Sequence, residues 1–336
     1  MGSWGAVFTG YGAFLPGPPI SNRALLEQHG QQFDLEKHEA TTGILARHWA
    51  APGQATSHIA AEAAKRALQQ AQLDPAQLDR IILGTSSPDY TNLAAACRVQ
   101  QLIGATCPAS DITAACAGFI YALEQAACLV RTGARHVLVI GADTKSRFIR
   151  ADDPVFGPIF SDGGGAVVLS ATDRPEAGLL DILLWADGSG FETLYVPAGG
   201  SMLPASRHTL EANLHGTLAT MPGKELALGA ARKMAELGRA LLERNGLLPA
   251  DVDVFIPHQA NYYIMKHIAA QLGIAEERMG SVIHRVGNCI AGTVPIALEQ
   301  AHAEGRLQPG ALVLLVAAGA GYSGGAVLYQ VPDANG

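Results

Sequence analysis

The sequence predicts an α/β fold built from two similar halves that pack around a pseudo-twofold axis. Helical patterns alternate along the chain with short continuous runs of Val, Ile and Leu, which are typical of strands buried on both faces of a sheet. The same order of helix, proline-marked turn and strand also occurs twice. Alternating helices and buried strands indicate parallel βαβ units, and the duplication indicates two similar sets of them.

The first sign of duplication is a pair of prolines. Pro75 follows a helical stretch and precedes the apolar run 81–83, and Pro249 lies between a similar stretch and the run 254–256. The two prolines are related by a sequence offset of 249 − 75 = 174. Each copy therefore predicts a helix, a turn and a strand in the same order.

A repeated segment supports the same register. The residues Ala-Leu-Glu-Gln-Ala occur at 122–126 and again at 297–301, with a sequence offset of 297 − 122 = 175. Each copy leads into an apolar strand, at 136–141 and at 311–316. Two agreeing offsets indicate a true repeat of the fold.

The repeat defines the expected domain organisation. Residues 1–174 form the first half and residues 175–336 the second, because the pattern breaks at 172–178. Residues 197–221 lack clear periodicity and contain Gly, Pro and Ser, so we expect an insertion that caps the site.

Composition excludes several classes of function. A chain of 336 residues with 49% hydrophobic residues can bury a large core. The net charge of −7 and the absence of long Lys/Arg runs give no footprint for nucleic acid. The longest apolar stretch, about residues 311–321, is too short to span a bilayer, and the N-terminus lacks the features of a signal peptide. We therefore expect a cytoplasmic protein.

The cysteines predict neither a disulfide framework nor a metal site. They are odd in number, scattered and never spaced as Cys-x-x-Cys. A single cysteine is by default a small buried hydrophobic residue, and three of the five are predicted to be of this kind. These three are Cys97, Cys107 and Cys128; the others are Cys116 and Cys289.

Cys116 stands out by its position. It follows a strand end and precedes the apolar helix 120–130, which Arg131 and Gly133 terminate. The unpaired N–H groups and positive dipole of a helix start favour thiolate over thiol, and the small neighbouring residues leave room for a substrate. The alternative is an ordinary buried cysteine.

Two further residues are candidates because of the repeat. His258 ends the strand 254–257, where α/β folds collect functional groups, and Asn288 follows Gly287 just before the repeated helix. Taken singly, each has a structural alternative, a core histidine and a helix N-cap. Because Cys116 and Asn288 precede equivalent helices, symmetry is expected to bring Cys116, His258 and Asn288 into one pocket between the halves.

The constellation resembles the β-ketoacyl-acyl-carrier-protein synthase III (KAS III) family of thiolase-fold condensing enzymes. The spacing from Cys116 to His258 is 258 − 116 = 142, and that from His258 to Asn288 is 288 − 258 = 30. The resemblance covers nearly the whole chain and implies two pseudo-twofold-related βαβαβ halves in a five-layer αβαβα arrangement. The segments that carry it are 42–44, 114–119, 160–169, 257–261, 287–288 and 319–321.

The resemblance also implies a mechanism. Cys116 accepts an acyl group from acyl-CoA or an acyl carrier protein, and the backbone N–H groups of Cys116 and Ala320 hold the oxyanion. His258 and Asn288 then stabilise the enolate formed when a malonyl-thioester loses carbon dioxide. A homodimer is implied, with no cofactor beyond the thioester substrates and no metal. The pathway implied is fatty-acid or secondary-metabolite biosynthesis.

The carrier-binding positions depart from the family pattern. Tyr263 stands where relatives that use coenzyme A commonly have Arg, Thr41 and Leu45 replace basic residues, and Lys37 replaces Trp. The remaining candidates for a phosphate or an acidic carrier protein are three basic residues, with a solvated helix face as their alternative, and one Asn that follows the histidine. They are Lys224, Arg232, Lys233 and Asn261.

The loop 87–93 resembles the segment that lines the acyl pocket of relatives across a dimer interface. It is about one residue longer and lacks their usual aromatic gate, so we expect Thr91, Asn92 and Leu93 to accommodate a longer or unusual acyl chain. Together with the altered carrier positions, this indicates a specialised enzyme, of the kind found in secondary metabolism.

The sequence leaves four alternative functions, each with a feature that argues against it. An acyltransferase of the same fold would pass the acyl group to an alcohol or amine without decarboxylation, and Asn288 argues against it. The duplicated α/β pattern disfavours a papain-type hydrolase. A chalcone-like synthase would have Gly-Phe-Gly-Pro-Gly where residues 319–321 stand, and a non-catalytic partner subunit would be expected to have lost Cys116.

Overall fold

The computed structural model describes residues 5–150, 153–174 and 178–333. Nine strands form the main sheet in the order β11-β12-β13-β8-β1-β7-β6-β4-β5. Within the described chain, β1 and β8 are joined through one pair, Ala6 and Gly178, so the sheet divides there into five strands and four. The strands are β1 (Gly5–Phe14), β4 (Arg80–Gly84), β5 (Ala109–Ile112), β6 (His136–Thr144), β7 (Asp162–Thr172), β8 (Gly178–Ala186), β11 (Val254–Pro257), β12 (Leu312–Gly319) and β13 (Ser323–Gln330).

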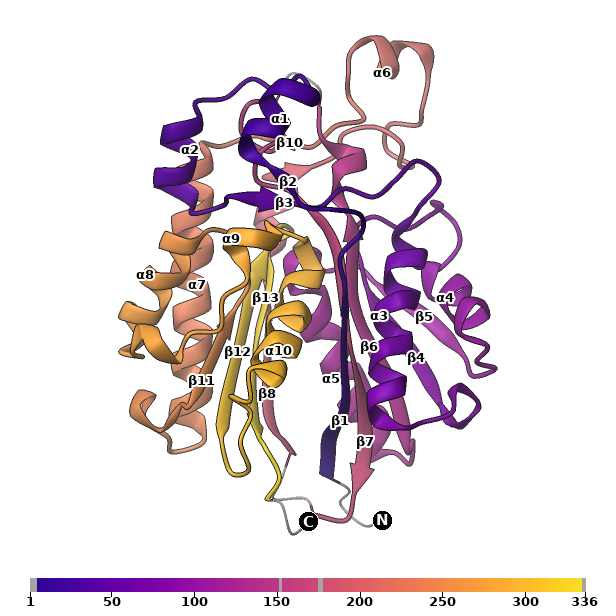
Figure 1. Ribbon diagram of the computed structural model, residues 1–336, viewed down its shortest axis with the longest axis vertical. Coiled ribbons are helices and arrows are strands. Elements are labelled where there is room, and N and C mark those ends of the chain that lie inside the picture. Colours follow the sequence, from indigo (N-terminus) through magenta and orange to yellow (C-terminus); the bar gives the residue numbers. More distant parts are fainter. Residues whose placement is uncertain (1–4, 151–152, 175–177, 334–336) are drawn as a thin grey trace.

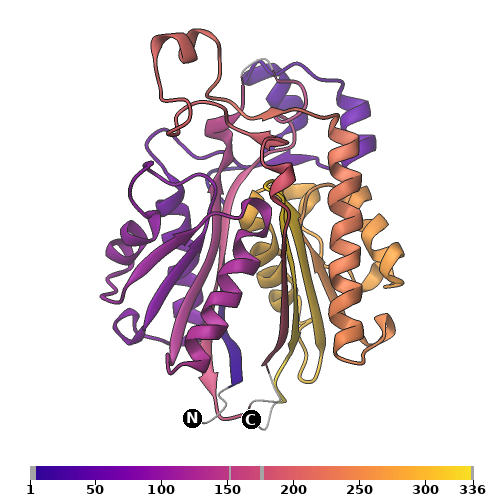
Figure 2. The same ribbon diagram turned by 180° about the vertical axis from the view of Figure 1, so that it is seen from behind.

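Helices complete five layers. Helices α3 (Thr56–Ala71) and α4 (Ala95–Ile103) cover the outer face of the first set of strands, and α7 (Gly223–Arg244) and α8 (Tyr262–Leu272) cover that of the second (Figures 1 and 2). Helices α5 (Gly118–Arg131) and α10 (Thr293–Ala303) lie between the two sets. This arrangement confirms the predicted five-layer αβαβα thiolase-like fold.

The two sets of strands have the same topology. In the first, β4 is parallel to β6, β6 is antiparallel to β7, and β7 is antiparallel to β1. In the second, β11, β12, β13 and β8 are related in the same way. The predicted domain boundary between residues 174 and 175 adjoins residues 175–177, which lie outside the described residues, and it stays a prediction.

Burial explains why the helix that follows Cys116 is apolar on most sides. Phe119, Ile120 and Leu123 of α5 are fully buried between the two sets of strands, and the outer helices cover two further apolar clusters. Glycines of β7 allow close packing of the central helix α10 against the strand. A Cβ atom on Gly165 would lie 2.6 Å from the backbone nitrogen of Ile296 in α10.

Short elements gather at one end of the molecule, opposite the termini (Figure 1). They include a hairpin of β9 (Leu194–Tyr195) and β10 (Leu218–Ala219), and the excursion between its strands carries α6 (Arg207–Glu211). The backbone N–H of Thr217 donates to the carbonyl of Phe148 (2.8 Å), which ties this segment to the loop after β6. A capping role for residues 197–221 stays a prediction. The remaining elements at this end are β2 (Ile20–Ser21), α1 (Asn22–Gln28), α2 (Leu35–Thr42), β3 (Ala46–Arg47) and α9 (Ile283–Val286).

The structure corrects part of the cysteine prediction. Cys107 is buried as expected, but Cys97 and Cys128 are exposed. Cys97 lies beside the carbonyl of Ala109 (3.8 Å) and Cys128 beside the carboxylate of Glu124 (3.5 Å), and both side chains stay exposed, which spacing alone does not reveal. Among the described helices, none is long and apolar enough to cross a membrane.

Candidate active site

Cys116 lies where the first half turns into its central helix. A single turn of 3₁₀ helix, η2 (Ala115–Ala117), leads directly into α5, so the predicted position at a helix start is confirmed. Ala115 has φ of +45°. A positive φ is uncommon outside glycine and concentrates at functional sites, since the surrounding structure must hold it.

The second half repeats this turn. Its 3₁₀ turn η7 (Ile290–Gly292) leads into α10, and Ile290 has φ of +53°. Ile290 and Ala115 are related by 290 − 115 = 175, which is the offset of the sequence repeat. The two turns are in contact. Directly after η2, a Cβ on Gly118 would lie 3.3 Å from the Cβ of Ala291 in η7. The two helix starts therefore meet between the sheets.

The end of β12 closes against Cys116. A Cβ atom on Gly319 would lie 2.7 Å from the backbone nitrogen of Cys116 and 3.0 Å from its Cβ, so only glycine fits here. The hydroxyl of Ser323 lies 2.8 Å from the carbonyl of Ala114 and 3.1 Å from that of Ala320. These contacts hold the turn that contains Ala320 beside the segment that carries Cys116.

His258 reaches the same region from β11. Its backbone N–H donates to the carbonyl of Val316 in β12 (2.8 Å), three residues before Gly319. The residue is 2% exposed, and its Nδ1 lies 2.7 Å from Oγ1 of Thr293, the first residue of α10. Burial lowers the pKa of His258 to about 4, so the ring is neutral near pH 7.

Asn288 is held rigidly two residues before η7. Its Oδ1 accepts from the N–H of Ile290 (2.9 Å), its backbone N–H donates to Ile159 (3.0 Å), and its carbonyl accepts from Ser161 (2.9 Å). Asn288 as a whole is 5% exposed. Asn288 therefore has the capping contact that its sequence position suggests, and this contact fixes the orientation of the carboxamide.

The electrostatics of Cys116 differ from the expectation at a helix start. The pKa of the Cys116 thiol is raised to about 12, mainly by burial and to a smaller extent by the carboxylate of Asp143, while Lys145 acts to lower it. The preference for thiolate that the sequence position suggests is outweighed by desolvation. Near pH 7, Cys116 is therefore a thiol and His258 a neutral imidazole.

Asp143 is a buried residue that the sequence interpretation missed. Its carboxylate accepts from the hydroxyl of Ser87 (2.7 Å), from the backbone N–H of Ser86 (2.8 Å) and from that of Ala291 (3.0 Å). It thereby joins the turn after β4 to η7. An Asp at the end of an otherwise apolar strand was the available signal. Thr293 was also missed, although it opens the repeated helix.

The predicted carrier-binding residues lie on the surface around the fold. Lys224 and Arg232 are exposed on α7, whereas Lys233 pairs with Glu236 (2.5 Å) and lies 4.5 Å over the ring of Trp185. Thr91, Asn92 and Leu93 are exposed in the loop before α4. A role for any of these residues in binding stays a prediction.

Asn261 already has a structural task. Its Oδ1 accepts from the backbone N–H groups of Tyr263 (2.9 Å) and Ile264 (3.2 Å), and its Nδ2 donates to the carbonyl of Thr41 (2.8 Å). Asn261 therefore caps α8 and ties it to α2, and its predicted contact with a carrier is not tested by these bonds.

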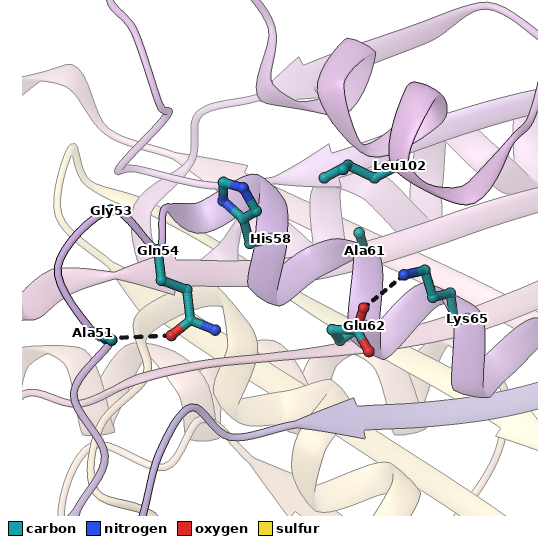
Figure 3. A pocket seen from close by; sticks show the side chains of 8 residues that line it. All are labelled: Ala51, Gly53, Gln54, His58, Ala61, Glu62, Lys65 and Leu102. Atoms are coloured by element: carbon teal, nitrogen blue, oxygen red, sulfur yellow. Dashed lines mark hydrogen bonds and ion pairs between the residues drawn. The ribbon is translucent and has the colours of Figure 1, made fainter.

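The described chain also has a surface groove of about 520 Å³ away from these residues (Figure 3). It lies on the outer side of α3, and its polar side chains are already paired. Lys65 contacts Glu62 (2.7 Å), and Gln54 accepts from the N–H of Ala51 (3.3 Å). In the described residues, no group of three or more His, Cys, Asp or Glu side chains is arranged to hold a metal.

Known proteins are similar to this chain in both sequence and fold. Residues 110–188 match the family model described as 3-oxoacyl-[acyl-carrier-protein (ACP)] synthase III, and residues 242–331 match the model of its C-terminal part. A β-ketoacyl-[acyl-carrier-protein] synthase III of Solibacter usitatus is 44% identical over 331 residues, which cover 97% of this chain and 98% of that protein.

Solved structures agree. The 3-oxoacyl-[acyl-carrier-protein] synthase III of Aquifex aeolicus is 35% identical, with a TM-score of 0.88 over 97% of this chain and 100% of that one. A priming β-ketosynthase from the R1128 polyketide biosynthetic pathway is 28% identical, with a TM-score of 0.88 over 98% and 97% of the two chains. The fold and the helix-start cysteine define a condensing enzyme of the thiolase fold. The chain belongs to the β-ketoacyl-acyl-carrier-protein synthase III family.

Proposed function

We propose that this protein catalyses the decarboxylative Claisen condensation of an acyl group, carried on Cys116, with a malonyl-thioester. The observation that supports this most is the junction of the two halves. The turns η2 and η7 meet beside the glycine end of β12, and the segments that carry Cys116, His258 and Asn288 all reach that junction.

The first step loads the enzyme. The Sγ of Cys116 attacks the carbonyl carbon of an acyl-CoA or acyl-carrier thioester as its proton passes to His258. The backbone N–H groups of Cys116 and Ala320 stabilise the oxyanion. The carbon–sulfur bond of the donor then breaks, and the thiol leaves with the proton. The turn that Ser323 anchors supports Ala320 in this role.

The second step forms the new carbon–carbon bond. The malonyl carboxylate leaves as carbon dioxide, and its electron pair becomes an enolate whose oxygen accepts from His258 and Asn288. The enolate carbon attacks the acyl carbon, and the Sγ of Cys116 leaves as thiolate and takes a proton from solvent. A transfer without decarboxylation would not use the rigid carboxamide of Asn288.

These two steps also indicate the class of enzyme. The enzyme is a 3-oxoacyl-acyl-carrier-protein synthase III type acyltransferase that uses thioesters of coenzyme A or of an acyl carrier protein and needs no other cofactor. Its product serves fatty-acid or secondary-metabolite biosynthesis. A cytoplasmic location stays a prediction.

A homodimer is part of the proposal. The strand β5 is an edge strand of the sheet and pairs with β4 on one side. Near it, Tyr90 and Leu93 are 71% and 64% exposed. An open strand edge beside large exposed apolar side chains is suited to pairing with a second copy. Sedimentation equilibrium measures the mass, and a monomer at micromolar concentration contradicts this assignment.

Intact-mass spectrometry after exposure to a panel of acyl-CoA and acyl-carrier thioesters tests the function. The wild type is expected to gain one acyl group, and Cys116→Ala none. Cys128→Ala is the matched control, because Cys128 is an exposed thiol outside the site. Equal labelling of the wild type and Cys116→Ala rejects covalent catalysis at this residue. Addition of malonyl-carrier then separates condensation, which releases carbon dioxide, from transfer or hydrolysis.

A further inference from the structure

The two steps of the proposed function require opposite properties of one nitrogen. In loading, Nε2 of His258 must offer a lone pair to the thiol proton of Cys116. In condensation, the same Nε2 must carry a proton for the enolate oxygen. A neutral imidazole has one N–H, on either Nδ1 or Nε2. Because burial keeps this ring neutral near pH 7, the proton must be able to occupy both nitrogens.

Thr293 has the geometry to accommodate both forms. Its Oγ1 lies 2.7 Å from Nδ1 of His258 and 3.0 Å from the carbonyl oxygen of Ile290. A carbonyl only accepts, whereas a hydroxyl has one proton and two lone pairs. When the hydroxyl proton points to Ile290, Oγ1 can accept from an Nδ1–H group. When the hydroxyl rotates, it donates to an unprotonated Nδ1.

We propose that Thr293 is a positioning residue whose rotating hydroxyl stabilises His258 in both neutral tautomers, one for each half of the reaction. The inference rests on the proposed function. Thr293 itself is fully buried, so water does not replace its hydroxyl as the partner of Nδ1.

The protons balance through the cycle. In loading, Nδ1 keeps its proton against Oγ1 of Thr293 while Nε2 takes the proton of the Cys116 thiol and passes it to the departing thiol. After that thiol leaves, the imidazole turns away from Thr293, releases the Nδ1 proton to solvent and takes a solvent proton at Nε2. When the ring returns, Nδ1 has a free lone pair, and the Thr293 hydroxyl turns to donate to it. Nε2–H then faces the enolate oxygen, and the reverse exchange follows product release.

A carboxylate at this position would act differently. In a Ser-His-Asp triad the acid holds the proton on Nδ1 and stabilises the imidazolium, so the histidine serves as base and acid through Nε2. A neutral hydroxyl with a carbonyl beside it has no such preference. No charged side chain contributes to the pKa of His258, which is lowered by burial alone.

The test compares Thr293→Val, which removes the hydroxyl with little change of shape, with Thr293→Ser, which retains it. In Thr293→Val an Nδ1–H would be a buried donor without a partner, so we expect the Nε2–H tautomer to prevail. Acyl loading, followed by rapid-quench intact mass, is expected to slow about 100-fold, the usual contribution of a general base. Carbon dioxide release by fully preloaded acyl-enzyme is expected to change less than about 5-fold. Thr293→Ser is expected to load within about 5-fold of the wild-type rate.

A spectroscopic measurement gives an independent readout. With ¹⁵N-labelled histidine, the free wild type is expected to have His258 protonated at Nδ1 and Thr293→Val at Nε2, with the signal assigned by its loss in His258→Gln. Thr132→Val controls for the loss of a hydroxyl, because Thr132 donates to the carbonyl of Cys128 (3.0 Å) at the opposite end of α5. It is expected to load at the wild-type rate.

The inference is overturned if Thr293→Val loads like the wild type, if Val and Ser are equally impaired, or if the tautomer is the same in the wild type and Thr293→Val. The tautomer measurement needs no turnover. It therefore tests Thr293 even if the wild type forms no adduct, a result that would instead reject the proposed function.

Discussion

The contact between Gly319 and Cys116 predicts the effect of one added methyl group. In Gly319→Ala the new Cβ would lie 2.7 Å from the backbone nitrogen of Cys116. Ordinary van der Waals contact begins at 3.4 Å, so the two segments must separate by about 0.7 Å (3.4 − 2.7). Because both contacts on Cys116 are with backbone or Cβ atoms, no flexible side chain can absorb the shift.

This displacement affects the proposed oxyanion hole directly. The N–H of Ala320 follows Gly319, and the N–H of Cys116 is the atom group that the methyl displaces. Loss of one such donor costs about 3 kcal/mol of barrier, which corresponds to about 100-fold in rate. We expect Gly319→Ala to slow acyl loading by this factor, with a loss of stability of about 1–3 kcal/mol from overpacking.

The loading rate is measured by intact mass against time at saturating donor, and folding by thermal unfolding of the same samples. Gly188→Ala is the matched control, since a Cβ there meets no atom within 4 Å. If Gly319→Ala remains folded and loads within about threefold of the wild type, the placement of an oxyanion hole at this contact is wrong.

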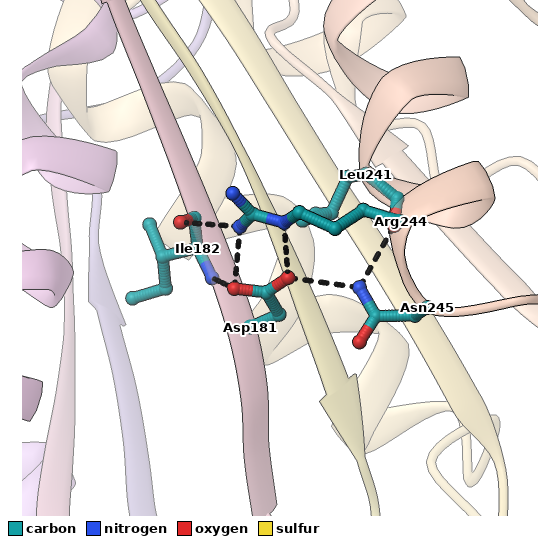
Figure 4. Close-up of polar contacts among 5 residues, drawn as sticks. All are labelled: Asp181, Ile182, Leu241, Arg244 and Asn245. Atoms are coloured by element: carbon teal, nitrogen blue, oxygen red, sulfur yellow. Dashed lines mark hydrogen bonds and ion pairs between the residues drawn. The ribbon is translucent and has the colours of Figure 1, made fainter.

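Three other predictions concern the site and the fold. Asn288→Ala is expected to reduce carbon dioxide release about 100-fold and loading much less, and equal losses in the two assays would contradict its role as an enolate donor. Burial lowers the pKa of His258 to about 4 from 6.5, so the unfolded chain binds a proton first as pH falls. The free energy of unfolding should therefore show no loss from His258 above pH 6.5 and a loss of about 3 kcal/mol from this residue by pH 4. Urea unfolding of the wild type and His258→Gln measures this loss, and an equal decline in both would contradict it. Arg244 donates from Nε (2.7 Å) and Nη2 (2.5 Å) to Asp181 (Figure 4), so Arg244→Lys loses this bidentate contact. Because the pair is partly exposed, the expected loss in the free energy of unfolding, measured by urea denaturation, is below about 1 kcal/mol.

The fold was predictable because its signals are local and occur twice. Each buried strand is a continuous apolar run, and the segment Ala-Leu-Glu-Gln-Ala marks both central helices, α5 and α10. Local patterns of this kind survive packing, since the helix and strand periods decide which side chains face inward. The helix-start position of Cys116 and the strand-end position of His258 followed from the same patterns.

The remaining features depend on packing between segments far apart in sequence. The contact of His258 with Thr293 joins β11 to α10, and the contact of Asp143 with Ala291 joins β6 to η7. The raised pKa of Cys116 is another such property, because desolvation depends on what surrounds the thiol rather than on the helix that follows it. The local rule alone predicted the opposite direction.

The duplicated fold provides two equivalent helix starts, and the structure shows why they are not chemically equivalent. Ala291 occupies the position equivalent to Cys116 at the offset of the repeat (291 − 116 = 175). The backbone N–H of Ala291 donates to the buried carboxylate of Asp143 (3.0 Å), whereas the corresponding backbone nitrogen of Cys116 lies beside the glycine end of β12. A carboxylate that already occupies the donor leaves no place for a substrate oxyanion at the second helix start. The bond that closes this second site also fixes η7, the turn between Asn288 and Thr293, so Asp143 of the first half supports the residues that the second half contributes to the shared site.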